Sequence, residues 1–98
     1  MSENEKLENV KKRLIFRSWH RGTREMDLIL GSFANTHVEG FTEEELALYD
    51  ELLQNSDPDL YNWISGREEL PDDKRDAVME KVLAHHYATN RKSGSDDR

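Results

Sequence analysis

The clearest structural signal in the sequence is the stretch at residues 41–54, which reads FTEEELALYDELLQ. Thr42 and Glu45 have the spacing of a capping box, in which each side chain accepts a hydrogen bond from the backbone of the other at a helix start. Phe41 and Leu46 occupy the two positions of a hydrophobic staple. The stretch therefore predicts a helix to about Gln54. Its apolar face is broad and comprises Leu46, Leu48, Tyr49, Leu52 and Leu53.

Two further helices are predicted upstream of this stretch. Ser2 and Glu5 have capping-box spacing, and the first helix then runs to about Ser18. Gly22 is expected to end it in the left-handed conformation, and Thr23 is expected to cap the second helix. The segment 37–40 reads as a loop. The inward residues of these two helices are Leu7, Val10, Leu14, Met26, Ile29, Leu30 and Phe33.

Two helices are also predicted downstream. Asp57 is expected to cap a short fourth helix with Pro58 at its first position, and Gly66 is expected to end it. After a turn at 68–71, Asp72 or Asp73 begins a fifth helix. Its inward residues are Val78, Met79, Val82, Leu83 and His86. Because no segment alternates polar and apolar residues at period two, we expect no strand and predict an all-α fold, a compact five-helix bundle.

The chain has 98 residues, which is the size of one small domain. We expect a single helical domain over residues 1–90 and a disordered polar tail over residues 91–98, because the tail is too polar to pack. Charged residues make up 36% of the chain and hydrophobic residues 35%. Much of the surface must therefore face water or a partner.

The composition excludes several classes of function. There is no cysteine, which rules out disulfides, thiolate metal sites and thiol nucleophiles. His20 and His37 are isolated in sequence, and the adjacent His85 and His86 point about 100° apart on a helix, so no metal site is expected. No catalytic motif is present, and we expect no enzyme activity from this chain alone. The acidic N-terminus and the short apolar runs predict a cytoplasmic protein without membrane insertion.

The charge is unevenly distributed along the chain. The net charge is −7. Residues 1–24 carry seven basic and three acidic side chains, whereas residues 25–66 carry ten acidic and no basic side chains. The ordinary interpretation is solvated helix faces, and the alternative is a surface that docks on a partner of mixed charge.

A stretch of basic residues supports a competing hypothesis. It contains no acid, is interleaved with Phe16 and Trp19, and comprises Lys11, Lys12, Arg13, Arg17, Arg21 and Arg24. Such a pattern is typical of a nucleic-acid-binding surface, so the alternative function is a small helical regulator that binds nucleic acid. The acidic pI of about 5.0 opposes this interpretation, and we expect no nucleic-acid partner. A generic interaction adaptor remains a third possibility.

The turn at residues 21–25, Arg-Gly-Thr-Arg-Glu, is the most unusual element. Arg21 and Glu25 present opposite charges near the start of the second helix, which by itself fits a local ion pair over a helix cap. A large aromatic residue, Trp19, precedes a bare glycine backbone and an arginine, a composition typical of interface hot spots. The sequence leaves open whether Trp19 faces the core or a partner.

These residues resemble the signature of the SdhE family, the succinate dehydrogenase assembly factors that promote covalent flavinylation. The resemblance begins with Arg-Gly-x-x-Glu at 21–25 and continues through Met-Asp-Leu at 26–28 and Gly-x-Phe-Ala at 31–34. It extends to Leu-Tyr-Asp-x-Leu-Leu at 48–53 and to the stretch 57–66. In all it covers roughly residues 12–87. Trp19-His20 depart from the pattern, because many relatives carry basic residues there.

The resemblance implies a five-helix bundle that binds the flavoprotein subunit of succinate dehydrogenase, or of the related fumarate reductase, and aids attachment of FAD to a histidine of that partner. It implies that Arg21, Gly22 and Glu25 contact the partner. The flanking residues expected to extend this face are Arg17, Trp19, His20 and Arg24. No cofactor of its own is implied, and transient FAD binding stays open. We expect a monomer.

Overall fold

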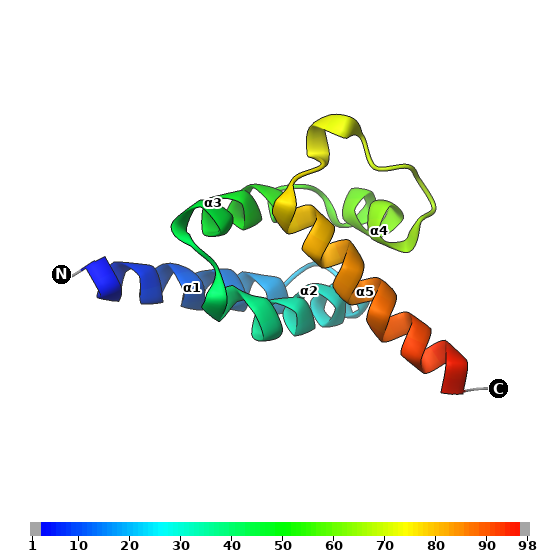
Figure 1. The fold of residues 1–98 in the computed structure, drawn as a ribbon, viewed down its shortest axis with the longest axis horizontal. Helices are drawn as coiled ribbons and strands as arrows, with labels where there is room; N and C mark the ends of the chain where they lie inside the picture. Colours follow the sequence, from blue (N-terminus) through cyan, green and yellow to red (C-terminus); the bar gives the residue numbers. More distant parts are fainter. Residues whose placement is uncertain (1–2, 97–98) are drawn as a thin grey trace.

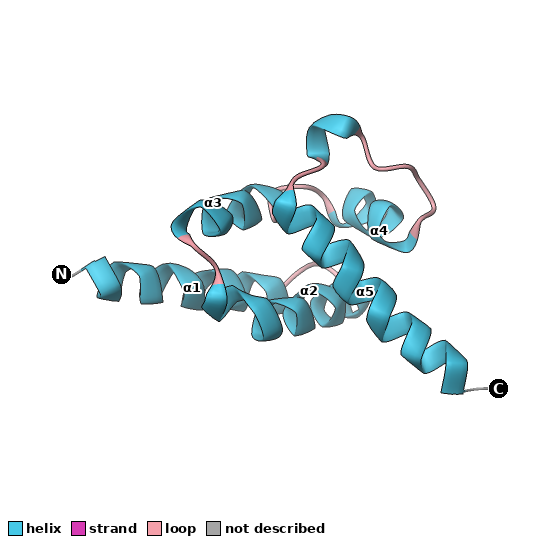
Figure 2. Cartoon of the chain, in the orientation of Figure 1, coloured by secondary structure: helices cyan, strands magenta, loops and turns pink. Residues whose placement is uncertain are grey.

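Five α-helices and two short 3₁₀ helices make up the described part of the chain (Figure 1). The computed structural model describes the backbone of residues 3–96 and the side chains of residues 5–87. The α-helices are α1 (Glu3–Trp19), α2 (Arg24–His37), α3 (Glu43–Leu52), α4 (Asp57–Ser65) and α5 (Ala77–Asp96); the 3₁₀ helices are η1 (Val38–Gly40) and η2 (Asp72–Lys74). Residues 3–96 contain no strand (Figure 2), so the predicted all-α five-helix bundle is confirmed.

The helices pack around one core. The most extensive contact is between α1 and α2, while α3 packs on α1 and α5, and α5 also crosses α2 and α4 (Figure 1). The start of α1 and the end of α5 lie at opposite ends of the molecule. The hydrophobic residues with no exposed surface come from α2, η1, α3, α4 and α5 and are Leu30, Phe33, Ala34, Val38, Tyr49, Leu60 and Val78.

Local sequence signals account for most of the helix ends. The capping box of α3 is present, because Thr42 Oγ1 accepts a hydrogen bond from the Glu45 N–H and Glu45 Oε1 accepts one from the Thr42 N–H. Thr23 caps α2, as predicted, by accepting a hydrogen bond from the Met26 N–H. Gly66 ends α4 in the left-handed conformation with a φ of 86°, also as predicted. The capping role predicted for Ser2 lies outside the described residues.

Two predicted glycine and cap roles are wrong. Gly22 is not left-handed, since Gly66 is the one residue with positive φ in the described chain. The N-cap of α4 is Ser56 rather than Asp57: Ser56 Oγ accepts a hydrogen bond from the Asp59 N–H, and Asp57 is the first residue of the helix. The carboxylate of Asp57 is thereby free for another role, described below.

Three element boundaries differ from the prediction. Residues 37–40 form the end of α2 and the 3₁₀ helix η1 instead of a loop, because Val38 is completely buried and holds the backbone against the core. Asp72 and Asp73 start η2, not α5; Asp76, which accepts a hydrogen bond from the Met79 N–H, precedes α5. The structure continues α5 to Asp96, whereas a disordered tail was predicted from residue 91. The division of the chain at residue 90 stays a prediction.

Candidate functional site

The turn between α1 and α2 is closed by side chains on both sides. It consists of residues 20–23 and joins Trp19, the last residue of α1, to Arg24, the first of α2. Thr23 caps α2, and Asp27 reaches back so that its Oδ1 accepts a hydrogen bond from the Arg21 N–H at 2.6 Å. The backbone of the turn is thus fixed by residues of the helix that follows.

Arg21 connects this turn to the junction of α3 and α4. Its Nε donates to Asp57 Oδ1 at 2.7 Å, and its two terminal nitrogens donate to the carbonyls of Leu53 (2.6 Å) and Asn55 (2.8 Å). The side chains of Arg21 and Asp57 are only 12% and 16% exposed. Arg21 therefore pairs with Asp57 and not, as the sequence suggested, with Glu25. The Arg21 guanidinium therefore links the α1–α2 turn to the junction of α3 and α4.

A glycine at residue 22 allows the Asp57 carboxylate to approach the backbone of the turn closely. Its N–H donates to Asp57 Oδ2 at 2.7 Å, so that Asp57 binds Arg21 with one oxygen and the glycine backbone with the other. A Cβ at Gly22 would lie 2.9 Å from Asp57 Oδ2. The absence of a side chain at residue 22 lets the Asp57 carboxylate reach the backbone. This close approach, and not a left-handed conformation, is the reason for a glycine at this position.

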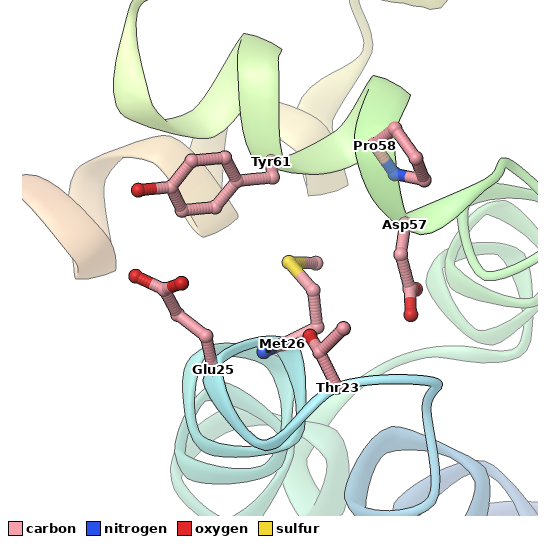
Figure 3. Close-up of a pocket in the computed structure, with 6 residues that line it drawn as sticks. All are labelled: Thr23, Glu25, Met26, Asp57, Pro58 and Tyr61. Carbon is pink, nitrogen blue, oxygen red and sulfur yellow. Dashed lines mark hydrogen bonds between the residues drawn. The ribbon is translucent and has the colours of Figure 1, made fainter.

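Arg24 and Glu25 occupy the first turn of α2, and both are exposed. No described residue forms a salt bridge with either of them. Glu25 lines a cavity of about 230 Å³ between the N-terminal ends of α2 and α4, shown in Figure 3. The other lining residues are Thr23, Met26, Asp57, Pro58 and Tyr61.

Trp19 packs between α1 and α2, and part of its ring remains accessible. Its indole ring lies directly on Gly31, where a Cβ would be within 2.3–2.5 Å of three ring atoms. Its Nε1 donates to Asn35 Oδ1 at 3.3 Å. The ring is half-buried, and its accessible part lines a shallow groove along α1 with Lys12, Ile15, Phe16 and His20.

The remaining predicted site residues, Arg17 of α1 and His20 of the turn, are both exposed. His20 stacks on Phe16 with ring centroids 3.9 Å apart, and His20 Nδ1 lies 2.7 Å from the Phe16 carbonyl oxygen. Arg17 forms a half-exposed salt bridge to Asp50 on α3 at 2.7 Å. Arg17, Trp19 and His20 thus lie in or beside the turn. Of the predicted site residues, only Arg21 and Gly22 share a partner, Asp57.

The basic stretch is partly neutralised within the chain. Arg21 binds Asp57, Arg17 binds Asp50, and Lys11 Nζ donates to the Glu39 carbonyl at 2.8 Å. Three of the six cations are therefore engaged with other elements. The surface left for a polyanion is smaller than the sequence pattern indicates.

Two histidines that are far apart in the sequence, His37 and His85, are neighbours in the structure. The rings of His37 and His85 lie 5.5 Å apart between α2 and α5, and His85 Nε2 lies 3.2 Å from Ser32 Oγ. Burial, and then the charge of His85, lower the pKa of both His37 and His86. Within the described residues, no group of three or more histidine, aspartate or glutamate side chains is placed to hold a metal ion.

Sequence reasoning missed two residues of this site. Asp57 was assigned to helix capping because it precedes a proline, although Ser56, three residues before Asp59, has the spacing of an N-cap and was the available signal. Tyr61 was assigned no role at this site. Its place in the cavity depends on how α4 packs against α2, and no local pattern encodes that.

Comparison with known proteins identifies the family. A family model described as "Flavinator of succinate dehydrogenase" matches residues 12–86. The chain is 40% identical over 85 residues to a succinate dehydrogenase assembly factor 2, mitochondrial, of Dictyostelium discoideum, covering 87% of this chain and 60% of that protein. It is 36% identical over 73 residues to the FAD assembly factor SdhE of Acetobacter pasteurianus, covering 74% and 67%.

A relative from Drosophila grimshawi, also named succinate dehydrogenase assembly factor 2, mitochondrial, is 38% identical over 84 residues, which is 57% of its length. The chain thus spans about three fifths of the eukaryotic relatives it matches. Those relatives are called mitochondrial, and cytoplasmic location stays a prediction for this chain. In the described part of the structure, none of the helices has the length and apolar character needed to cross a membrane. On the family match and these identities, the chain belongs to the family described as "Flavinator of succinate dehydrogenase".

Proposed function

We propose that this protein is an assembly factor that binds the flavoprotein subunit of succinate dehydrogenase and promotes covalent attachment of FAD to it. The observation that carries the proposal is the α1–α2 turn, which falls inside the family match and is rigidly held by Asp57 through Arg21 and Gly22. A fixed turn can bind a partner without the entropy cost of ordering a flexible loop.

The proposed role is positioning rather than chemistry. The flavin and its acceptor histidine would both lie in the partner, and the assembly factor would hold the partner in the geometry that the attachment reaction requires. We propose that the chain carries no FAD of its own, acts as a monomer and also accepts the related fumarate reductase subunit. Its own residues at the interface would be Gly22, Arg24 and Glu25, with Arg21 holding the turn in place.

The test is coexpression of the flavoprotein subunit with and without this protein, followed by in-gel flavin fluorescence. We expect strong covalent fluorescence only when this protein is present. Equal fluorescence in the two samples would overturn the proposal.

Two variants test whether the turn is the docking surface. Gly22→Arg and Glu25→Ala should each keep the helical circular dichroism and reduce partner binding. Gly40→Arg is the matched control, because nothing lies within 4 Å of a Cβ at Gly40 and η1 is remote from the turn. If the Gly22 and Glu25 variants bind as well as the Gly40 variant, the turn is only a helix cap.

The nucleic-acid alternative makes a separate prediction. A regulator that uses the basic residues of α1 should retain a DNA or RNA probe at low ionic strength and lose it steeply as salt is added. We expect no retention, since Arg17, Arg21 and Lys11 are engaged within the chain. Retention of the probe would favour the alternative.

A further inference from the structure

The cavity beside the α1–α2 turn has mostly apolar walls, and two acidic residues, Glu25 and Asp57, also line it. Figure 3 shows Met26 between the two helices, with Tyr61 and Pro58 of α4 on one side and Glu25 of α2 and the N-cap Thr23 on the other. The Glu25 carboxylate and the Tyr61 hydroxyl lie on the same side of the opening. The volume of about 230 Å³ is enough for one large side chain and not for an extended ligand.

The two acidic residues that line the cavity, Asp57 and Glu25, differ in their binding partners. Asp57 is fully used, since one of its oxygens binds Arg21 and the other binds the Gly22 N–H. Glu25 forms no salt bridge with any described residue. Glu25 interacts electrostatically with His86, and burial lowers the pKa of His86 although Glu25 acts to raise it. Burial thus disfavours the charged form of His86, which weakens His86 as a counterion for Glu25.

The aromatic wall is suited to a guanidinium. Within the chain, Arg67 already places its guanidinium carbon 5.5 Å from the centroid of the Tyr61 ring, although Arg67 does not line the cavity. Arginine stacks on aromatic faces and pairs with a carboxylate through two parallel hydrogen bonds, while its methylene stem packs on apolar surface. An apolar side chain would fill the same space but would take water from the Glu25 carboxylate without replacing its hydrogen bonds.

We propose that this cavity receives an arginine side chain of the partner polypeptide, with the stem on Met26 and Pro58 and the guanidinium at Glu25 beside Tyr61. This inference rests on the proposed function, because it names the kind of partner residue that the docking site recognises. Charge complementarity supports it beyond the cavity. Residues 25–66, which supply most of the lining, carry ten acidic and no basic side chains.

The first test measures affinity for the flavoprotein subunit. Glu25→Gln removes the charge and keeps the shape, and we expect at least about tenfold weaker binding that depends less on salt than binding of the unmodified protein. The matched control is Glu44→Gln, because Glu44 is also exposed and also occupies the second position of a helix, α3. Unchanged affinity for Glu25→Gln would overturn the inference while leaving the flavinylation result, and thus the proposed function, intact.

The second test needs no flavoprotein. The free protein is titrated with N-acetyl-arginine methylamide and with the neutral citrulline analogue, and backbone amide shifts are followed by NMR. We expect the arginine probe alone to shift Thr23, Met26 and Tyr61, and we expect Glu25→Gln to abolish those shifts. Equal shifts with the citrulline probe, or none with the arginine probe, would contradict the assignment of an arginine site.

Discussion

At the scale of single residues, Asp57 organises the site. Its two oxygens accept hydrogen bonds from Arg21 Nε and from the Gly22 backbone, and the rest of the Arg21 guanidinium is used by the carbonyls of Leu53 and Asn55. The Asp57 side chain is only 16% exposed, and these hydrogen bonds compensate for the water that it loses on burial. Removing it would leave the arginine largely buried and without a counterion.

We expect Asp57→Ala to lower the free energy of unfolding by about 2–4 kcal/mol, because it leaves an uncompensated and largely buried charge. The control is Asp50→Ala, which breaks the half-exposed salt bridge to Arg17 and should cost about 0–1 kcal/mol. Urea unfolding followed by circular dichroism measures both. Equal midpoints for the two variants would mean that the Arg21–Asp57 pair does not hold the turn.

At the scale of elements, the contact between α1 and α2 depends on one glycine. The Trp19 indole lies on the bare backbone of Gly31, so the two helices approach more closely than any side chain at residue 31 would permit. The same contact fixes Trp19 just before the turn. The packing of these helices therefore sets the position at which the turn begins.

We expect Gly31→Ala to destabilise the protein by about 1–3 kcal/mol, although alanine is the better helix former, because the added Cβ overlaps the indole. The cost should fall in a Trp19→Phe background, whose smaller ring leaves room. A thermal unfolding double-mutant cycle measures this coupling. Additive effects of the two substitutions would contradict a direct contact.

The elements also show how far the sequence could predict the structure. Helix starts such as Thr42 with Glu45, and the stop at Gly66, were predictable because capping involves residues close in the chain. The Arg21–Asp57 pair was not, since its members are 36 residues apart and the pairing depends on how α4 docks. The wrong conformation predicted for Gly22 has the same origin, because the carboxylate that requires a glycine comes from a distant element.

At the scale of the whole molecule, one hydroxyl group joins three helices. Tyr49 of α3 is fully buried, its hydroxyl lies 2.6 Å from Ser18 Oγ of α1, and it donates to the Leu30 carbonyl of α2 at 3.5 Å. Burial raises the pKa of Tyr49 to about 12, although the hydrogen bond with Ser18 acts in the opposite direction. The neutral phenol is thus built into the centre of the bundle.

This predicts a specific alkaline sensitivity. Because the pKa of Tyr49 is about 12 in the folded protein and about 10 in an unfolded chain, the stabilisation is complete below about pH 10 and is lost as the pH rises toward 12. Tyr49→Phe should remove this part of the pH dependence. Urea midpoints measured from pH 9 to about pH 11.5 compare the two proteins, and parallel curves would show that Tyr49 does not contribute to it.

The tie between Arg21 and Asp57 also has a consequence for synthesis of the protein. A ribosome releases the turn long before the residue that fixes it, since Asp57 follows Arg21 by 36 positions. Until α4 has emerged and docked, Arg21 has no carboxylate to bind and the Gly22 N–H has no acceptor. A nascent or truncated chain that lacks a folded α4 therefore lacks the contacts that fix the conformation of this turn.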